Sequence, residues 1–309
     1  MLASVLINNY NYGDFLEEAV TSVLAQSHDD IEIILVDDGS TDNSLQVIQA
    51  LADTHSNIIV CSKPNGGQLS AFNAGYTLAK GEVLFFLDAD DRYHPDYVAK
   101  ALAVYDEHPA CDFLFCAYEQ FGQVNQPVVQ PFAQRLTDLG YSGLLTFCRR
   151  AWIGEPTTTL SLRRSLAEQF FPIPFEKEWR IRADDCLIWL ASLFNGRKFY
   201  LKEPLVGYRI HGHNRFFGCA KDPAVEYRRA ISYARLFANA AQANGQYGYI
   251  RGYDLCKLLL EEAATGRKNI ALLDQYRRVL KHLPEVSFVN RWRYLRKLKR
   301  LKRAAESVR

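Results

Sequence analysis

The chain has 309 residues, 48% hydrophobic and 23% charged, a composition that is ordinary for a folded protein of one large or two small domains. Its 37 Lys and Arg residues against 35 Asp and Glu give a formal net charge of +2, which excludes the strong overall positive field of many nucleic-acid-binding proteins. Every apolar run is shorter than the roughly 18 residues that a membrane span needs, so we expect none.

Cysteine usage and the N-terminal residues bear on location. The seven cysteines form no Cys-x-x-Cys pair and lie mostly in apolar stretches, which favours reduced thiols and a cytoplasmic protein. A strand-like run begins at residue 3 without a charged segment before it, so we expect no secretory signal. A peripheral position on the cytoplasmic membrane face is compatible with all of these features.

The first hundred residues alternate strand-like and helix-like segments. Apolar, β-rich runs cover 3–8, 31–38, 57–63 and 83–88, and helical patterns cover 14–26, most of 39–53, and 69–80. This order predicts an α/β fold whose central sheet is mostly parallel and flanked by helices. Ligands bind beyond the carboxyl ends of such strands, and polar clusters follow three of these four runs.

The rest of the chain divides into a less regular part and a helical part. Residues 113–121 are strand-like, 124–134 have a loop composition, and 184–195 follow a helical pattern. From 221 onward the pattern is helical, with Gly-containing breaks. We therefore expect a catalytic domain over 1–220 and a helical C-terminal region over 221–309.

Two of the polar segments suit a nucleotide. In VDDGSTDNS (36–44), the carboxylates of Asp37 and Asp38 could accept from a ribose hydroxyl or a pyrimidine N–H, whereas capping of the next helix is the structural alternative. In KPNGGQLSAFNAG (63–75), Gly66 and Gly67 would let the backbone approach a phosphate-bearing ligand, although a glycine pair more often marks only a turn.

A third segment, VLFFLDADD (83–91), carries carboxylates directly after five apolar residues. Asp88 and Asp90 there have the spacing of hard oxygen ligands for a divalent cation that also binds a diphosphate. The alternative is a solvated loop before a helix that begins near Pro95.

Two further groups are candidates for chemistry. Asp184 and Asp185 begin an amphipathic helix, where a carboxylate could be a general base or could simply stabilise the positive helix end. His211 and His213 follow a short strand, and a neutral imidazole there could complete a metal site begun by Asp90, although a lone histidine is more often structural.

Taken together and in this order, these motifs resemble family 2 glycosyltransferases of the GT-A fold, over residues 3 to about 215. The resemblance implies an inverting, metal-dependent enzyme that moves a sugar from a nucleoside-diphosphate donor to a hydroxyl of a glycan or lipid-linked acceptor. It also implies a role in the synthesis of cell-surface polysaccharides or glycoconjugates, and Mn²⁺ or Mg²⁺ as the cation.

The resemblance assigns roles to residues. For the nucleotide sugar it points to Asn9, Tyr10, Asp37, Asp38, Asn65, Gly66, Gly67, Gln68 and Asp88. For the metal it points to Asp90 and His211, and for the base to the pair Asp184 and Asp185, of which we favour Asp185.

The chain departs from the family pattern at three places. The proline that is common after the first strand is replaced within the NNYNY run, Phe72 stands where many members have arginine, and Asp184 stands where glutamate is usual. The change at residue 72 implies that a cation for the diphosphate comes from elsewhere or is missing.

Two other functions compete with this interpretation. A sugar-phosphate nucleotidyltransferase also combines an α/β sheet, acids and nucleotide sugars, but it does not need a base such as Asp185. A catalytically silent subunit that binds nucleotide sugars and recruits partners through its C-terminal helices is the other alternative.

The C-terminal tail is strongly basic. Residues 291–303 contain eight Lys and Arg and no acid, and apolar residues at 288, 292, 295, 298 and 301 follow helical spacing. The pattern indicates either a helix on an anionic membrane surface or a solvated helix that packs on the domain through one stripe.

Overall fold

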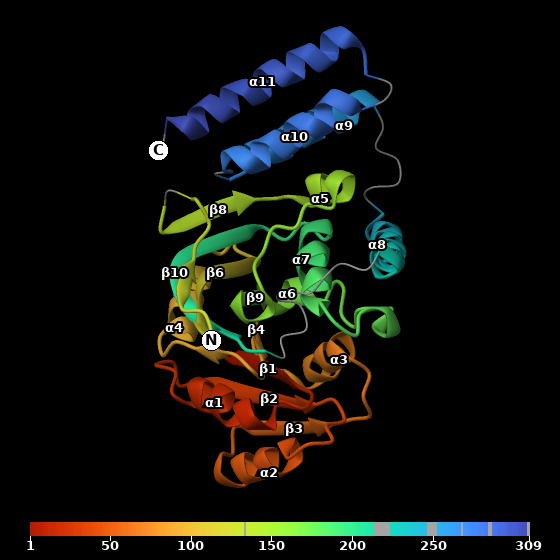
Figure 1. Ribbon diagram of the computed structural model, residues 1–309. Coiled ribbons are helices and arrows are strands. Elements are labelled where there is room, and N and C mark those ends of the chain that lie inside the picture. Colours follow the sequence, from red (N-terminus) through yellow and green to blue (C-terminus); the bar gives the residue numbers. More distant parts are fainter. Residues whose placement is uncertain (133, 213–222, 246–251, 267, 284–285, 308–309) are drawn as a thin grey trace.

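The computed structural model describes residues 1–132, 134–212, 223–245, 252–266, 268–283 and 286–307. In this part of the chain ten strands form one sheet with helices on both faces (Figure 1). Its first half is parallel, in the order β3-β2-β1-β4, and confirms the predicted α/β fold. The strands are β1 (Ala3–Asn9), β2 (Ile31–Asp37), β3 (Ile58–Ser62) and β4 (Val83–Asp88).

Helices connect these strands and cover the sheet. They are α1 (Gly13–Leu24), α2 (Ser44–Thr54), α3 (Gln68–Leu78) and α4 (Tyr97–Glu107). Buried side chains of α1 and α4 belong to the hydrophobic core on one face, and those of α3 to the core on the other.

The continuous apolar run of β4 follows from this arrangement. Leu84 and Phe86 pack into the core beside α3, while Val83, Phe85 and Leu87 pack into the core beside α1 and α4. Since successive side chains point to opposite faces and both faces are covered, every position of the strand must be apolar.

The second half of the sheet is mixed. Its strands are β5 (Arg92–Tyr93), β6 (Phe113–Gly122), β7 (Gln126–Val128), β8 (Leu136–Gly140), β9 (Leu160–Arg163) and β10 (Lys198–Ile210). β9 lies antiparallel between β4 and β6, and β10 runs parallel to β6. The short β7 pairs with β6 inside the segment that was predicted to be a loop.

Short helices complete this half. They are α5 (Gly143–Arg149), α6 (Arg164–Ala167), α7 (Ala183–Leu193) and 3-10 turns at Thr157–Thr159 and Glu176–Glu178. The α7 helix begins at the predicted acid pair and packs its apolar residues into the same core as α3. It therefore carries Asp184 and Asp185 to the edge at which β1, β2 and β4 end.

The C-terminal region is helical, as expected. It contains α8 (Pro223–Asn244), α9 (Gly252–Ala264), α10 (Ile270–His282) and α11 (Phe288–Glu306). The boundary expected near residue 220 lies outside the described residues. In Figure 1, α11 runs along α10 on the side away from β1, and α9 lies beside both.

A buried carboxylate fastens this region to the sheet domain. Glu262 of α9 accepts from the backbone N–H groups of Leu144 (2.6 Å) and Leu145 (2.9 Å). These groups lie in the first turn of α5, where a backbone N–H has no acceptor within its own helix. It also accepts from the hydroxyl of Tyr276 on α10 at 2.6 Å. The three helices are thus joined by one fully engaged side chain.

Two predicted absences can be compared with the structure. Among the described helices, none combines the length and apolar character of a membrane span. The described cysteines at 61, 111, 116, 148, 186 and 256 are all free thiols.

Candidate active site

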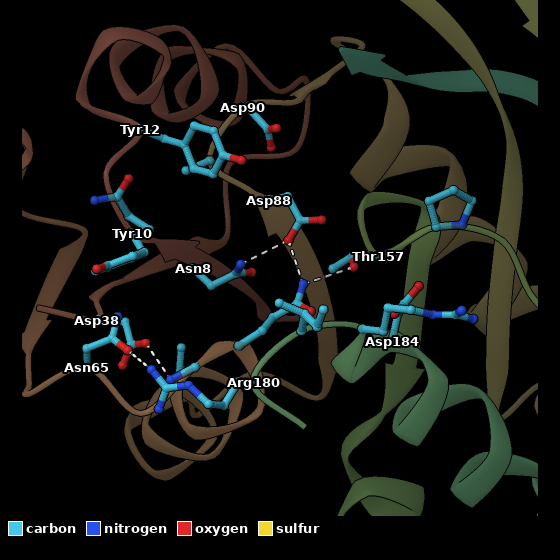
Figure 2. A pocket seen from close by; sticks show the side chains of 18 of the residues that line it. Asn8, Tyr10, Tyr12, Asp38, Asn65, Asp88, Asp90, Thr157, Arg180 and Asp184 are labelled. Atoms are coloured by element: carbon cyan, nitrogen blue, oxygen red, sulfur yellow. Dashed lines mark hydrogen bonds between the residues drawn. The ribbon is translucent and has the colours of Figure 1, made fainter. Parts of the chain in front are cut away.

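A cavity of about 570 Å³ opens at the carboxyl ends of the parallel strands (Figure 2). The register explains why polar residues meet there, because Asn9 of β1 is opposite Asp37 of β2 and Asn8 is opposite Asp88 of β4. Four carboxylates line it: those of Asp38, Asp88, Asp90 and Asp184. The remaining lining residues are Asn8, Asn9, Tyr10, Tyr12, Asn65, Gly67, Gln68, Ala71, Ala89, Trp152, Pro156, Thr157, Arg180, Ile181, Arg182 and Tyr208.

Asp38 organises one end of the cavity. Its Oδ1 accepts from Lys63 Nζ at 2.6 Å and from the N–H of Gly66 at 2.9 Å, and its Oδ2 accepts from the N–H of Gly67 at 2.6 Å. Gly67 has a φ of 92°, a conformation that a residue with a Cβ rarely adopts. The predicted glycine pair therefore wraps the backbone around a carboxylate, and of the two glycines only Gly67 lines the cavity.

Asp37 lies behind this end and does not line the cavity. Its carboxylate is 1% exposed and accepts from Asn9 Nδ2 at 3.0 Å and from the N–H of Ser40 at 3.1 Å. It therefore fixes the turn after β2 and the side chain of Asn9, which does line the cavity together with Tyr10.

Asp88 lies at the centre of the edge. Its Oδ1 accepts from Asn8 Nδ2 at 2.9 Å and from Gln68 Nε2 at 3.0 Å. Burial, followed by the charge of nearby Asp90, raises the pKa of the Asp88 carboxyl to about 6. The amide oxygen of Gln68 accepts from the N–H of Ala183 at 2.9 Å, so one glutamine joins β4 to the start of α7.

Asp90 lines the cavity and contacts His211, which is not itself a lining residue, with 3.0 Å between Oδ2 of the aspartate and Nε2 of the imidazole. The other acid of this turn, Asp91, is buried and accepts from Thr158 Oγ1 at 2.5 Å and from the N–H of Arg209 at 2.8 Å. Asp91 thus holds the turn against its neighbours, whereas Asp90 is left to face the cavity. His213, the other histidine of the motif, lies outside the described residues.

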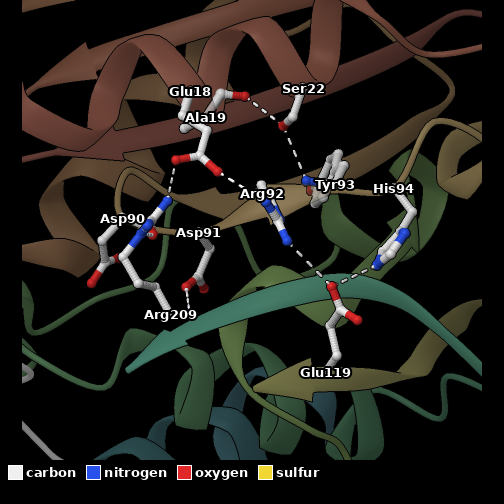
Figure 3. Close-up of polar contacts among 10 residues, drawn as sticks. All are labelled: Glu18, Ala19, Ser22, Asp90, Asp91, Arg92, Tyr93, His94, Glu119 and Arg209. Atoms are coloured by element: carbon white, nitrogen blue, oxygen red, sulfur yellow. Dashed lines mark hydrogen bonds and ion pairs between the residues drawn. The ribbon is translucent and has the colours of Figure 1, made fainter. Parts of the chain in front are cut away.

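Charged side chains brace the turn from behind (Figure 3). Arg209 of β10 donates from Nε to the carbonyl oxygen of Asp90 at 2.7 Å and forms an ion pair with Glu18 of α1. Glu18 also pairs with Arg92 at 3.2 Å, and Arg92 reaches Glu119 at 3.5 Å. These contacts fix the backbone from which the Asp90 side chain projects.

Only one acid of the α7 pair, Asp184, lines the cavity, and Asp185 is buried behind it. Asp184 lines the cavity, and burial followed by the charge of Asp185 raises its pKa to about 7. Asp185 is 0% exposed and lies beside Arg182, whose Nη2 donates to its Oδ1 at 2.8 Å. Burial raises the pKa of Asp185, and the Arg182 guanidinium opposes that rise.

Sequence reasoning missed the two arginines before this pair. Arg180 and Arg182 are the lining cations within the described residues, and Phe72 is instead a core residue whose ring lies 5.0 Å from that of Phe86. The carbonyl oxygen of Arg180 accepts from the N–H of Gln68 at 2.9 Å, which places it beside the glycine turn. The run WRIRADD, with two arginines before two acids, was the available signal.

Curated relatives of the chain are glycosyltransferases. An uncharacterized glycosyltransferase of Nostoc sp. is 39% identical over 223 residues, which are 71% of this chain and 68% of that protein. The putative teichuronic acid biosynthesis glycosyltransferase TuaG of Bacillus subtilis is 36% identical over 211 residues, 68% of this chain and 79% of that protein.

Solved structures share the fold at low identity. TarS 1-349 of S. aureus in complex with UDP-GlcNAc superposes with a TM-score of 0.59 at 18% identity, covering 99% of this chain and 92% of that chain. The mannosyltransferase PcManGT from Pyrobaculum calidifontis, in complex with GDP-Man and Mn²⁺, gives a TM-score of 0.51 at 17% identity, with 96% and 85% covered.

The family assignment rests on a family model together with these relatives. The model of glycosyl transferase family 2 covers residues 4–171, which contain β1 to β4 and the cavity residues up to Thr157. The likeness to solved structures adds that the fold is that of the GT-A glycosyltransferases. The chain belongs to glycosyl transferase family 2.

Proposed function

We propose that this glycosyltransferase acts with inversion, moving a sugar from a nucleoside-diphosphate donor to a hydroxyl of a glycan or lipid-linked acceptor. The observation that carries the proposal is the cavity itself, which brings Asp38, Asp88, Asp90 and Asp184 from three separate segments to one space. So many carboxylates around one cavity suit a ligand rich in hydroxyls that arrives with a cation.

The nucleotide occupies the end around Asp38 and Tyr10. Three donors already occupy Asp38, two at Oδ1 and one at Oδ2, and the remaining lone pair of Oδ2 accepts from the nucleobase. The ring of Tyr10 offers a flat surface for the nucleobase. Asn65, Gly67 and Gln68 contribute backbone and amide groups on the same side. Solved structures of the same fold with UDP-GlcNAc and with GDP-Man support a nucleotide sugar as the donor.

Asp90 and His211 would hold Mn²⁺ or Mg²⁺. A carboxylate oxygen and an imidazole nitrogen 3.0 Å apart form a donor pair that suits Mn²⁺, and the bound Mn²⁺ of the mannosyltransferase supports a metal. The described residues contain no cluster of three or more acidic, histidine or cysteine ligands, so these two side chains would leave positions for waters and diphosphate oxygens. When bound, the cation would neutralise charge on the leaving nucleoside diphosphate.

Asp185 is our candidate for the general base, which removes the proton of the acceptor hydroxyl as that oxygen attacks the anomeric carbon. Arg182 holds Oδ1 of this carboxylate, and Oδ2 is buried with no hydrogen-bond partner in the described part of the chain. A buried unpaired oxygen is costly, and an acceptor hydroxyl would satisfy it. Arg182 and Trp152, which line the cavity beside Asp185, must shift to admit that hydroxyl.

Asp184 is the alternative base, because it already faces the cavity. If Asp185 is the base, Asp184 binds a hydroxyl of the donor sugar from the position that it now occupies.

The acceptor belongs to a cell-surface polysaccharide or glycoconjugate, a proposal that the teichuronic acid relative supports. The enzyme meets this acceptor on the cytoplasmic side.

A donor panel tests the proposal. The purified chain is incubated with UDP-, GDP- and TDP-sugars and Mn²⁺, with and without a glycan or lipid-linked acceptor, and the release of nucleoside diphosphate is measured. We expect release from one donor class and none from the others. Pyrophosphate release from a nucleoside triphosphate and a sugar phosphate would instead indicate a nucleotidyltransferase, and donor binding without any release would indicate a silent subunit.

A further inference from the structure

The helix α11 presents two unlike faces. Tyr294 and Leu298 are buried, and the helix packs through this side on α9 and α10. Three apolar residues at its start lie on the solvent side instead: Phe288 is 80% exposed, Val289 70% and Trp292 52%. The stripe predicted from 288 to 301 is therefore split, because Phe288 and Trp292 do not join Leu298 on the packed side.

Two of the eight cations of this helix have structural partners. Arg291 donates from Nη2 to the carbonyl oxygen of Leu283 at 2.8 Å, and Lys302 pairs with Asp274 of α10 at 2.9 Å. The other six lie on the exposed side and form no ion pair within the described residues. They are Arg293, Arg296, Lys297, Lys299, Arg300 and Arg303.

We propose that this exposed side of α11, with Phe288, Val289 and Trp292 at one end and the six free cations along it, docks on an anionic phospholipid surface. Cations near such a surface are attracted by its negative potential, and each adds to the binding. Exposed aromatic and aliphatic side chains gain by leaving water for the headgroup boundary, and an indole is suited to that position. The guanidinium of Arg296 lies 4.5 Å from the Trp292 ring centre, so charge and apolar surface meet at one place.

Charge and shape favour lipid over the other occupants. A second copy would bring the same six cations against each other, which repels. A nucleic acid would use the cations and could stack on the rings, but Val289 offers neither a charge nor a π-face. The whole chain has a formal net charge of only +2, whereas residues 291–303 contain eight Lys and Arg and no acid.

Vesicle flotation of the full chain tests the proposal. The vesicles are neutral phosphatidylcholine alone, or the same lipid with phosphatidylglycerol, at low and high salt. We expect flotation with the anionic vesicles that falls as salt rises. The double variant Arg296→Gln/Arg300→Gln should bind on the order of 20-fold more weakly, and Phe288→Ser/Trp292→Ser should also lose binding.

Matched variants separate this surface from general charge and apolarity. Lys80→Gln/Lys177→Gln removes two exposed cations of the catalytic domain. Tyr227→Ser removes a ring of α8 that is 69% exposed. Both control variants should float like the unchanged chain. Equal flotation of the α11 variants and the unchanged chain would overturn the proposal. Tighter binding to a single-stranded RNA than to the vesicles would also overturn it. So would the finding that the chain is a dimer and that the α11 variants lose flotation only because they dissociate it. Circular dichroism of each variant checks that the helix content of the chain is unchanged.

Discussion

The guanidinium of Arg182 donates from Nη2 to Oδ1 of Asp185 over 2.8 Å, while the second oxygen of that carboxylate is buried and, among the described residues, has no hydrogen-bond partner. Arg182 itself has a φ of 62°, an uncommon conformation for a residue with a Cβ. A strained residue that orients a half-satisfied carboxylate beside a cavity is the arrangement expected of a positioned base.

Removing Arg182 should therefore disturb the base more than the donor. In Arg182→Ala we expect the turnover to fall on the order of 10²-fold, because a misoriented base costs that much. The pKa of Asp185 should rise when the guanidinium is lost, so the acidic limb of the rate profile should move to higher pH. Arg182→Lys should recover part of both effects. A turnover unchanged in the alanine variant would contradict the role.

The pH dependence of the unchanged enzyme follows from the acid pair. The pKa of Asp184 is raised to about 7 and that of Asp185 is also raised, and only a carboxylate can take up the proton. The rate should therefore fall as the pH is lowered, through an acidic limb that lies above the usual range of a carboxyl group. If Asp184 is the base, that limb should lie near pH 7. Initial rates at saturating donor and Mn²⁺ measure this, and a profile without an acidic limb would show that neither acid is the base.

The turn at residues 88–91 yields a prediction that separates metal binding from support of the fold. Asp90→Ala and His211→Ala should raise the Mn²⁺ concentration needed for half-maximal activity and leave the melting temperature close to that of the unchanged chain. Asp91→Ala should instead destabilise the fold by about 1–3 kcal/mol, because it leaves two donors, the buried Thr158 hydroxyl and the backbone N–H of Arg209, without this acceptor. Metal titrations and thermal melts of the three variants, with a chelator control, distinguish the roles. If all three behave alike, the division is wrong.

The glycine turn around Asp38 allows a test with a matched control. In Gly67→Ala the new Cβ would lie 2.3 Å from Cα of Arg180, so the turn must move away from Asp38. We expect calorimetry to show a donor affinity at least tenfold weaker, because the proposed site for the nucleobase is built on this turn. Gly245→Ala has a similar positive φ but no atom within 4 Å of its Cβ, and should bind the donor normally. Equal affinities in the two variants would exclude the turn from the donor site.

Much of the site is visible in the sequence because it lies at strand ends. The alternation of strands and helices, together with the polar residues after 3–8, 31–38 and 83–88, is sufficient to bring Asn9, Asp38 and Asp88 to one edge. Parallel strands in register require this, whatever the loops do.

Contacts between distant segments could not be predicted in this way. Arg180 enters the cavity because its carbonyl oxygen accepts from Gln68, more than a hundred residues earlier, and no local pattern specifies that pairing. The same limit applies to α11, where spacing identifies an amphipathic helix but not which apolar residues pack. Phe288 and Trp292 lie six residues before the packed residues Tyr294 and Leu298, respectively, and are left exposed.

The acid pair can be assigned by measuring turnover and donor affinity together. Asp185→Asn keeps the shape of the side chain but cannot take up a proton, so we expect transfer to fall at least about 10²-fold, with donor and Mn²⁺ affinities nearly unchanged. Asp184→Asn should mainly weaken donor affinity. Near wild-type turnover in Asp185→Asn, or loss of transfer with intact donor binding in Asp184→Asn alone, would contradict Asp185 as the base and assign that role to Asp184.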